Sequence, residues 1–121
     1  MGDLSLHFSK KEFACKDGCG FDTVQPGLIK VLERIRERLR RPVKIVSGCR
    51  CAKRNADVDG AKNSAHLRGY AADVKVVGSR ERFELVWAAL SVGVTRLGIG
   101  QNFVHLDIDP DITGSVMWVY E

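Results

Sequence analysis

The sequence predicts an α+β fold in which amphipathic helices pack on a small, mainly antiparallel sheet. Helical periodicity is concentrated early in the chain and short β-rich runs are grouped late, a pattern that favours this class. Size points the same way, since 121 residues with 45% hydrophobic and 28% charged side chains can bury one core but not two. We therefore expect a single domain spanning residues 1–121.

A short first helix is predicted just after Ser9. Ser9 and Glu12 have the spacing of a capping box, in which each side chain satisfies a backbone N–H of the other residue. Phe8 and Phe13 flank this box at positions suited to a hydrophobic staple, which fixes the direction in which the chain enters the helix.

The second predicted helix begins near Pro26 and ends before Pro42. Much of the chain's net charge of +4 lies between residues 30 and 41. That charge is most simply the solvated face of this helix, so no nucleic-acid partner is expected. The opposite face carries an apolar stripe of Leu28, Leu32, Ile35 and Leu39.

A third helix and five strands complete the prediction. Ser79 is placed to cap the helix, which ends before Gly93. Its buried stripe is expected to consist of Phe83, Val86, Trp87 and Leu90. Runs of β-branched and aromatic residues predict strands at Val43–Ser47, Tyr70–Val77, Val94–Ile99, Phe103–Ile108 and Val116–Tyr120.

His66 and Asp73 can meet only if the chain turns between them. Seven residues rise about 10 Å along a helix and about 23 Å along a strand, so regular structure keeps the two side chains apart. Gly69 supplies the conformational freedom for a turn. We therefore expect a loop histidine that folds back over an aspartate near the start of a strand.

The second run of interest surrounds His105. In a strand, residues two apart share a face, so His105 and Asp107 point the same way. Val104, Leu106 and Ile108 then face the other side and can join the core. His105 therefore lies on the face opposite the core, where it can be the third donor of a metal site.

Two histidines and one aspartate form a three-ligand set, which leaves zinc a fourth position for water, as in catalytic sites. Bound zinc lowers the pKa of that water and polarises a carbonyl, so amide hydrolysis is the expected reaction. On the His105 face, Asp107 is the nearest candidate for the general base. The remaining histidine, His7, is expected at the surface or in packing rather than as a ligand.

Ordered motifs from about Phe8 to Asp107 resemble the zinc D-alanyl-D-alanine carboxypeptidase family. This family also includes the L-alanyl-D-glutamate peptidases of phage endolysins, the D-Ala-D-Ala dipeptidases of vancomycin resistance and the signalling domain of hedgehog proteins. The motifs are Val43-Lys44-Ile45-Val46-Ser47-Gly48-Cys49-Arg50, Asn55, Gly60-Ala61-Lys62-Asn63-Ser64-Ala65-His66, Gly69-Tyr70-Ala71-Ala72-Asp73 and Val104-His105-Leu106-Asp107.

The resemblance implies a hedgehog- or DD-peptidase-like fold and a zinc metallopeptidase that hydrolyses amide bonds in peptidoglycan stem peptides. Three positions match the family's zinc ligands: His66, Asp73 and His105. Arg50 matches an arginine that stabilises the oxyanion and contacts the substrate, a role that suits a permanently charged guanidinium. Ser64 matches a serine that helps to bind substrate.

The catalytic base is where this chain departs from many relatives. They carry an acid three residues before the last ligand, whereas this chain has Asn102, whose amide cannot accept a proton from water. Asp107 is therefore assigned as the base, with orientation of His105 as the competing role.

Two questions of function stay open at this stage. The bond that is cut is either the terminal D-Ala-D-Ala bond or an internal bond of the stem peptide or cross-link. A different class is a catalytically impaired, zinc-containing module that binds cell wall or protein, as the hedgehog relatives do.

The four cysteines, Cys15, Cys19, Cys49 and Cys51, leave three alternatives. Their spacing fits poorly with a zinc ribbon, although a structural zinc remains one interpretation. Two disulfides are a second, in which a Cys49–Cys51 pairing is disfavoured because so short a loop is strained. Reduced thiols of a protein made in the cytosol are the third.

Met1–Leu6 lacks the basic start and the apolar run of a secretory signal, and no segment has the length and hydrophobicity of a membrane span. We expect cytoplasmic synthesis with action at the cell wall after phage-type release, or a signal that has been removed. We expect a monomer whose partner is a stem peptide.

Overall fold

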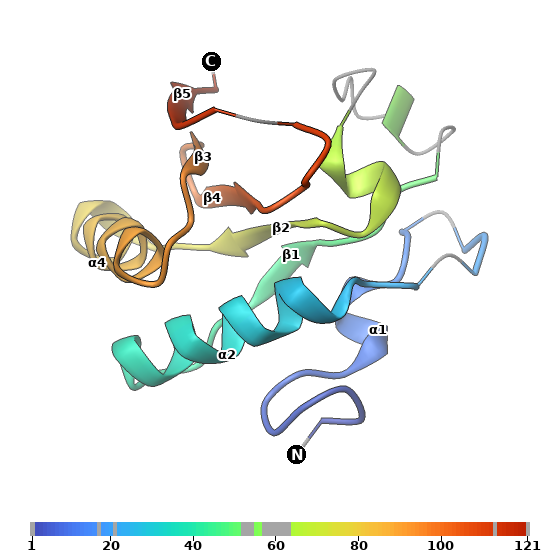
Figure 1. The fold of residues 1–121 in the computed structure, drawn as a ribbon. Helices are drawn as coiled ribbons and strands as arrows, with labels where there is room; N and C mark the ends of the chain where they lie inside the picture. Colours follow the sequence, from blue (N-terminus) through green and yellow to red (C-terminus); the bar gives the residue numbers. More distant parts are fainter. Residues whose placement is uncertain are drawn as a thin grey trace.

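The computed structural model describes residues 2–16, 18–20, 22–51, 55–56, 64–112 and 114–120. Within them the strands form one sheet in the order β1-β2-β4-β3-β5 (Figure 1). The neighbours β1-β2, β2-β4 and β4-β3 are antiparallel, and β3 pairs with β5 in parallel. The strands are β1 (Ile45–Ser47), β2 (Ala71–Lys75), β3 (Arg96–Ile99), β4 (Phe103–Asp107) and β5 (Val116–Val119). The prediction of an α+β fold with a mainly antiparallel sheet is confirmed, although each strand is shorter than its predicted run.

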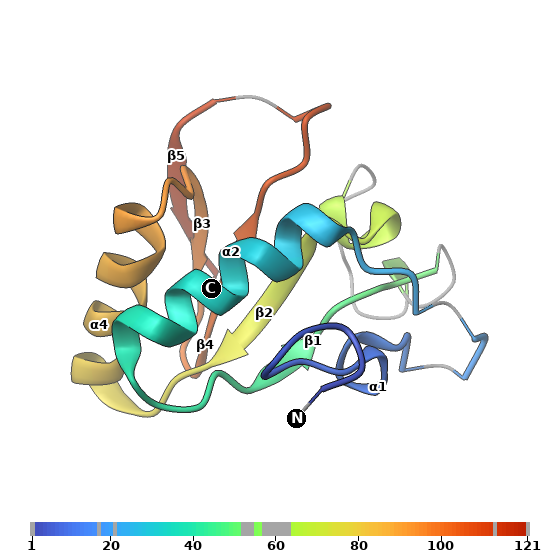
Figure 2. The same ribbon diagram turned by 60° about the horizontal axis from the view of Figure 1, so that its bottom comes forward.

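One face of the sheet is covered by two long helices. These are α2 (Pro26–Leu39) and α4 (Gly78–Ser91), which pack against each other beside the strands (Figure 2). The strand residues that contact these helices are every second residue, as expected when successive side chains point to opposite faces of a sheet. They are almost fully buried. They include Ala72, Val74, Leu97, Val104 and Leu106. In the part of the chain that is described, no helix has both the length and the apolar character needed to cross a membrane.

The first helix, α1 (Lys10–Phe13), forms as predicted. The Ser9 backbone N–H donates to Glu12 Oε2 at 2.7 Å, one half of the capping box. The rings of Phe8 and Phe13 are both buried, with centroids 6.0 Å apart, so the staple is also present. α1 therefore begins and is anchored where the sequence indicates, and it packs against β1.

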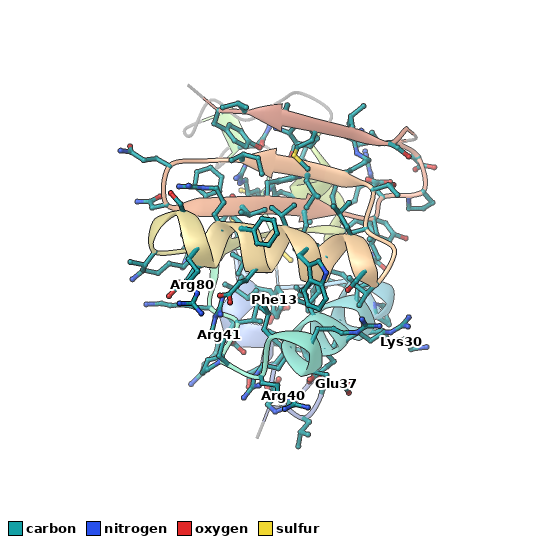
Figure 3. The ribbon with its side chains drawn as sticks, turned by 90° about the vertical axis from the view of Figure 1, so that its left-hand side faces the viewer. Phe13, Lys30, Glu37, Arg40, Arg41 and Arg80 are labelled. Carbon is teal, nitrogen blue, oxygen red and sulfur yellow. The ribbon has the colours of Figure 1, made fainter. Side chains whose placement is uncertain are left out.

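The second helix also follows the prediction. α2 has Pro26 in its first turn and ends at Leu39, because Arg40 adopts a left-handed conformation with φ 57°. Figure 3 shows Lys30, Glu37 and Arg40 at the outer surface, which agrees with a solvated charged face. The buried residues of α2 are Leu28, Ile29, Leu32 and Ile35, so the predicted apolar stripe is confirmed except at Leu39, which is only partly buried.

The third predicted helix exists as α4, but its predicted cap is wrong. The helix begins at Gly78, and Val77 rather than Ser79 is the N-cap residue. The Val77 N–H donates to Glu81 Oε1 at 2.9 Å, so a carboxylate reaching back from the first turn replaces a serine hydroxyl.

The predicted buried stripe of α4 is wrong as well. Phe83, Trp87 and Leu90 are 70%, 50% and 51% exposed, and Val86 is only partly buried. The buried face consists of Leu85, Ala88 and Ala89. Apolar residues occur nearly all round α4, so its periodicity was compatible with either face.

The opposite face of the sheet carries polar residues. Strand register places five residues in one row across all five strands: Ser47, Asp73, His105, Gly98 and Trp118. This row is the platform on which the candidate site is built.

Candidate metal centre

His66 reaches the sheet from a short 3₁₀ helix, η1 (Ala65–Arg68), that precedes β2. Ser64 caps η1, because its Oγ accepts a hydrogen bond from the His66 backbone N–H at 3.2 Å. Gly69 ends it with φ +76°, and a side chain there would meet the Thr23 carbonyl oxygen at 2.3 Å. The turn between His66 and Asp73 that the sequence required is therefore present, at the glycine that was expected to form it.

The three predicted ligands converge on one point. His66 Nε2 lies 3.2 Å from Asp73 Oδ1 and 3.2 Å from His105 Nδ1. His105 Nδ1 lies 3.0 Å from Asp73 Oδ1. Donors bound at about 2.0–2.1 Å in a tetrahedral zinc site lie roughly 3.3 Å apart, so this triangle of nitrogen and oxygen atoms fits zinc. All three side chains are buried, which shields the centre from bulk water.

The outward-facing ring nitrogens fix the tautomer of each histidine. His66 Nδ1 lies 2.5 Å from the Gly48 carbonyl oxygen, which can only accept, so Nδ1 carries the proton and the Nε2 lone pair faces the centre. His105 Nε2 lies 2.7 Å from Asp107 Oδ2, so by the same logic Nε2–H donates and Nδ1 faces the centre. Both imidazoles are held in the form that a metal requires.

Asp107 lies on the far side of His105 from the centre. Its Oδ2 accepts from His105, and its Oδ1 accepts from Arg96 Nε at 2.8 Å. The residue is 3% exposed. Both carboxylate oxygens are thus engaged, and neither is directed at the point where the three ligands meet.

Arg50 lies beside the ligand triangle. Its Nη2 donates to Asp73 Oδ2 at 3.2 Å, the oxygen that does not contact the histidines. Ser47 Oγ and Asn55 Oδ1 accept from the same guanidinium, each at 3.3 Å. A permanent positive charge is therefore held next to the centre by three separate acceptors.

Comparison with known protein families identifies the family of this chain. The sequence profile of the family described as Peptidase M15 matches residues 6–107. The chain belongs to the peptidase M15 family. M15 peptidases are zinc-dependent, which agrees with the donor set and spacing at His66, Asp73 and His105. A search of curated proteins finds no match to this chain.

The electrostatics of this M15 peptidase favour a charged Asp73. Burial alone would raise the pKa of Asp73, but its interactions with His105 and His66 outweigh it and hold the pKa well below its usual range. For His105, burial alone would lower the pKa, but hydrogen bonds to Asp107 and Asp73 outweigh it and raise the pKa. In the metal-free protein a proton on His105 therefore competes with a metal ion.

An aromatic wall borders the centre on the β5 side. The Trp118 ring lies 5.3 Å from the His105 ring, and Arg96 lies over the Trp118 ring at 5.3 Å. Gly98 makes this possible, since a Cβ there would come within 2.6 Å of Trp118 and Tyr120. The wall thus depends on a glycine in the middle of β3.

Three contributors to the site were missed by sequence reasoning: Gly48, Arg96 and Trp118. Gly48 acts through its backbone carbonyl, for which a sequence carries no chemical signal. Arg96 is one of 19 basic residues, and only its pairing with β4 distinguishes it. The alternation of β5 gives a signal for Trp118, because it places that residue on the same face as His105 once the register is known.

Of the four cysteines, Cys49 stands apart from the other three. It is 2% exposed, and burial, followed by the negative charges of Asp22 and Cys15, raises its pKa to about 11. Cys15, Cys19 and Cys51 place their sulfur atoms within 4.8 Å of one another. His7 is exposed and its Nδ1 lies 2.6 Å from Glu33 Oε1, as expected of a surface residue, and it belongs to neither of the possible metal groups among the described residues.

Proposed function

We propose that this M15 peptidase is a zinc metallopeptidase that hydrolyses an amide bond in peptidoglycan stem peptides, as a carboxypeptidase or as an endolysin-type endopeptidase. The observation that carries the proposal is the convergence of His66, Asp73 and His105 within 3.2 Å. The substrate class rests on the motif resemblance. The proposed place of action is the cell wall, reached after phage-type release from the cytoplasm.

The three ligands would hold zinc through two neutral imidazoles and one carboxylate. Bound zinc would supply a water of lowered pKa and polarise the scissile carbonyl. The protein's own part is to keep the imidazoles in the correct tautomer, which the Gly48 carbonyl and the Asp107 carboxylate do.

Arg50 is proposed to stabilise the negative charge that develops on the scissile carbonyl oxygen. Its guanidinium contacts the proposed ligand Asp73, and its side chain is only 14% exposed, so the charge is largely removed from solvent. Charge-assisted donors act most strongly in such surroundings. Its bonds to Ser47 and Asn55 hold the guanidinium in place while Nη2 contacts Asp73.

Asp107 is proposed as a positioning residue. The general-base role would require Asp107 to break its bond to His105 or to Arg96, and its carboxylate contacts the ring nitrogen of His105 that faces away from the centre. Orientation of His105 requires only the bond that is already present. Ser64 caps η1 and so positions His66, and its predicted contact with substrate stays a prediction.

A zinc-containing binding module of the same fold is the second candidate. The observation that favours it is the engagement of both carboxylates at the site, Asp73 and Asp107, together with an amide at the exposed Asn102. Among the described residues that contact the centre, none presents a carboxylate oxygen without a partner.

Mass spectrometry of purified peptidoglycan fragments separates the two functions. Zinc-loaded protein is incubated with the fragments beside a chelator-treated sample and the His105→Ala variant. Cleavage by the loaded wild type alone would establish the peptidase, and the mass lost would identify the bond. Intact fragments that co-sediment with zinc-loaded protein would establish the binding module instead.

A further inference from the structure

Three cysteines from two distant segments of the chain gather on one side of the molecule. Cys15 and Cys19 belong to the loop after α1, whereas Cys51 follows β1. Their sulfur atoms lie within 4.8 Å of one another. We propose that Cys15, Cys19 and Cys51 bind a second zinc ion, separate from the His66–Asp73–His105 centre and structural in role.

The spacing of the Cys15 and Cys51 sulfur atoms matches a zinc-thiolate site. Cys15 Sγ and Cys51 Sγ lie 3.8 Å apart. Two thiolates bound at about 2.3 Å to a tetrahedral ion lie roughly 3.8 Å apart, whereas the sulfurs of a disulfide lie about 2.05 Å apart. Among the described residues, three thiolates would fill three of the four positions of such an ion.

The local backbone is shaped to present these sulfurs. Gly18 donates its N–H to the Cys15 carbonyl at 3.3 Å and has φ +76°, so the chain doubles back and returns Cys19 toward Cys15. Gly20 follows with φ +88°. From the other segment, the Cys51 backbone N–H donates to Cys15 Sγ at 3.4 Å.

Cys49 takes no part in this cluster and serves as an internal control. Its side chain belongs to the hydrophobic core, and its backbone N–H donates to the Phe13 carbonyl at 2.8 Å. It is thus a packing residue two positions from a proposed ligand.

The proposed ion would hold the segment that carries Arg50. Within residues 48–51, the Gly48 carbonyl oxygen accepts a hydrogen bond from His66, and Arg50 donates one to Asp73. Cys51 in the same segment bonds to Cys15. A zinc ion at the thiols would therefore tie the loop after α1 to the segment that supports the candidate centre. This site does not depend on the proposed peptidase activity.

Cobalt substitution tests the site in the wild-type chain. A His₂Asp centre has no sulfur ligand, so sulfur-to-cobalt charge-transfer bands in the near ultraviolet would report the thiol cluster alone. We expect these bands in the wild type, in Cys49→Ala and in the double variant His66→Ala/His105→Ala. We expect their loss in Cys15→Ser/Cys51→Ser.

Zinc content provides the second measurement. The wild type and Cys49→Ala should hold about two zinc ions per chain, and each double variant about one. Circular dichroism reports whether each variant folds. If a cysteine variant does not fold, the wild-type cobalt spectrum still shows whether the thiols bind a metal ion. Absence of charge-transfer bands in the wild type, or an intact mass that shows an oxidised Cys15–Cys51 pair, would overturn the proposal.

Discussion

Asp73 and His105 occupy directly paired positions on β2 and β4, and their Oδ1 and Nδ1 atoms lie 3.0 Å apart. The positions of two of the three proposed ligands are therefore set by the register of the sheet itself. A slip of one residue would turn either side chain to the opposite face. His66 is added from η1, so the centre combines a rigid strand pair with one capped turn.

Removal of any ligand should abolish zinc retention at this centre. We expect His66→Ala, Asp73→Ala and His105→Ala each to lose about one zinc ion per chain and all hydrolysis, because the remaining two donors cannot complete the site. Metal analysis after dialysis checks this. His7→Ala is the matched control, since the contacts of His7 among the described residues are with Glu33, outside the site. Full zinc content in one of the three variants would remove that residue from the ligand set.

Asp107→Asn separates the two roles considered for Asp107. If Asp107 orients His105, the variant should bind zinc about 10–100-fold more weakly, because an amide is a poorer partner for His105 Nε2–H. If Asp107 is the base, zinc affinity should be unchanged and turnover should fall. Competition with a chelator of known affinity measures the first quantity, and fragment cleavage under saturating zinc measures the second. We expect weakened zinc binding.

The convergence of His66, Asp73 and His105 was predictable because each of them has a local signal in the sequence. Alternation in Phe103–Ile108 places His105 opposite the core residues, and Gly69 marks the turn that returns His66 to Asp73. The supports of the triad were not predictable in this way. Gly48 acts through a carbonyl, and Arg96 reaches Asp107 across a strand pairing that no short motif encodes.

The α4 helix and the thiol cluster show the same limit. The apolar residues of α4 lie on nearly all of its faces. Only packing against α2 and the sheet therefore decides that Leu85 is buried and Trp87 is half exposed. Cys15 and Cys51 are 36 residues apart in sequence, and the pairing of α1 with β1 brings them together. The spacing of residues along the chain predicts neither the buried face of α4 nor the contact between Cys15 and Cys51.

Arg50→Lys should reduce turnover without loss of zinc. A lysine ammonium cannot keep the three contacts that hold the guanidinium to Asp73, Ser47 and Asn55. Removal of one such donor to a developing oxyanion costs roughly 100-fold or more in kcat. Steady-state kinetics on a stem-peptide substrate provide the measurement, with metal content as the control. A change confined to KM would assign Arg50 to substrate binding alone.

The stability of the metal-free protein should have a maximum in mildly acidic solution. The pKa of Asp73 is lowered in the folded state, so its contribution is present above about pH 4 and is lost as pH falls through the lowered value. The pKa of His105 is raised, so its contribution is present below about pH 6.5 and is lost as pH rises through the raised value. Zinc should remove the upper limit, because it binds the neutral imidazole.

Thermal unfolding from about pH 3 to 9, with chelator and with zinc, checks this pH dependence. The His105→Ala variant should lose the decline on the alkaline side in chelator, whereas His7→Ala should keep it. A metal-free wild type whose Tm rises between about pH 6 and 8 would contradict the assignment.

Gly48→Ala should damage both the fold and the centre, because Gly48 has no room for a side chain. Its Cβ would meet Phe13 Cα at 2.7 Å, a backbone atom that cannot rotate away. Relief of this clash must displace residue 48 or α1, at a cost of about 1–3 kcal/mol in unfolding free energy. Displacement would also separate the residue 48 carbonyl from His66 Nδ1, which should weaken zinc binding about 10-fold or more.

Gly27→Ala is the matched control for this clash. Gly27 lies in α2, where a Cβ makes only ordinary contact with Ile108 at 3.4 Å, so alanine should leave stability unchanged or raise it by about 0.5–1 kcal/mol. Urea unfolding and chelator competition on both variants provide the comparison. If Gly48→Ala bound zinc like the wild type while unfolding more easily, the Gly48 carbonyl would be a packing contact and the His66 tautomer would be set by other means.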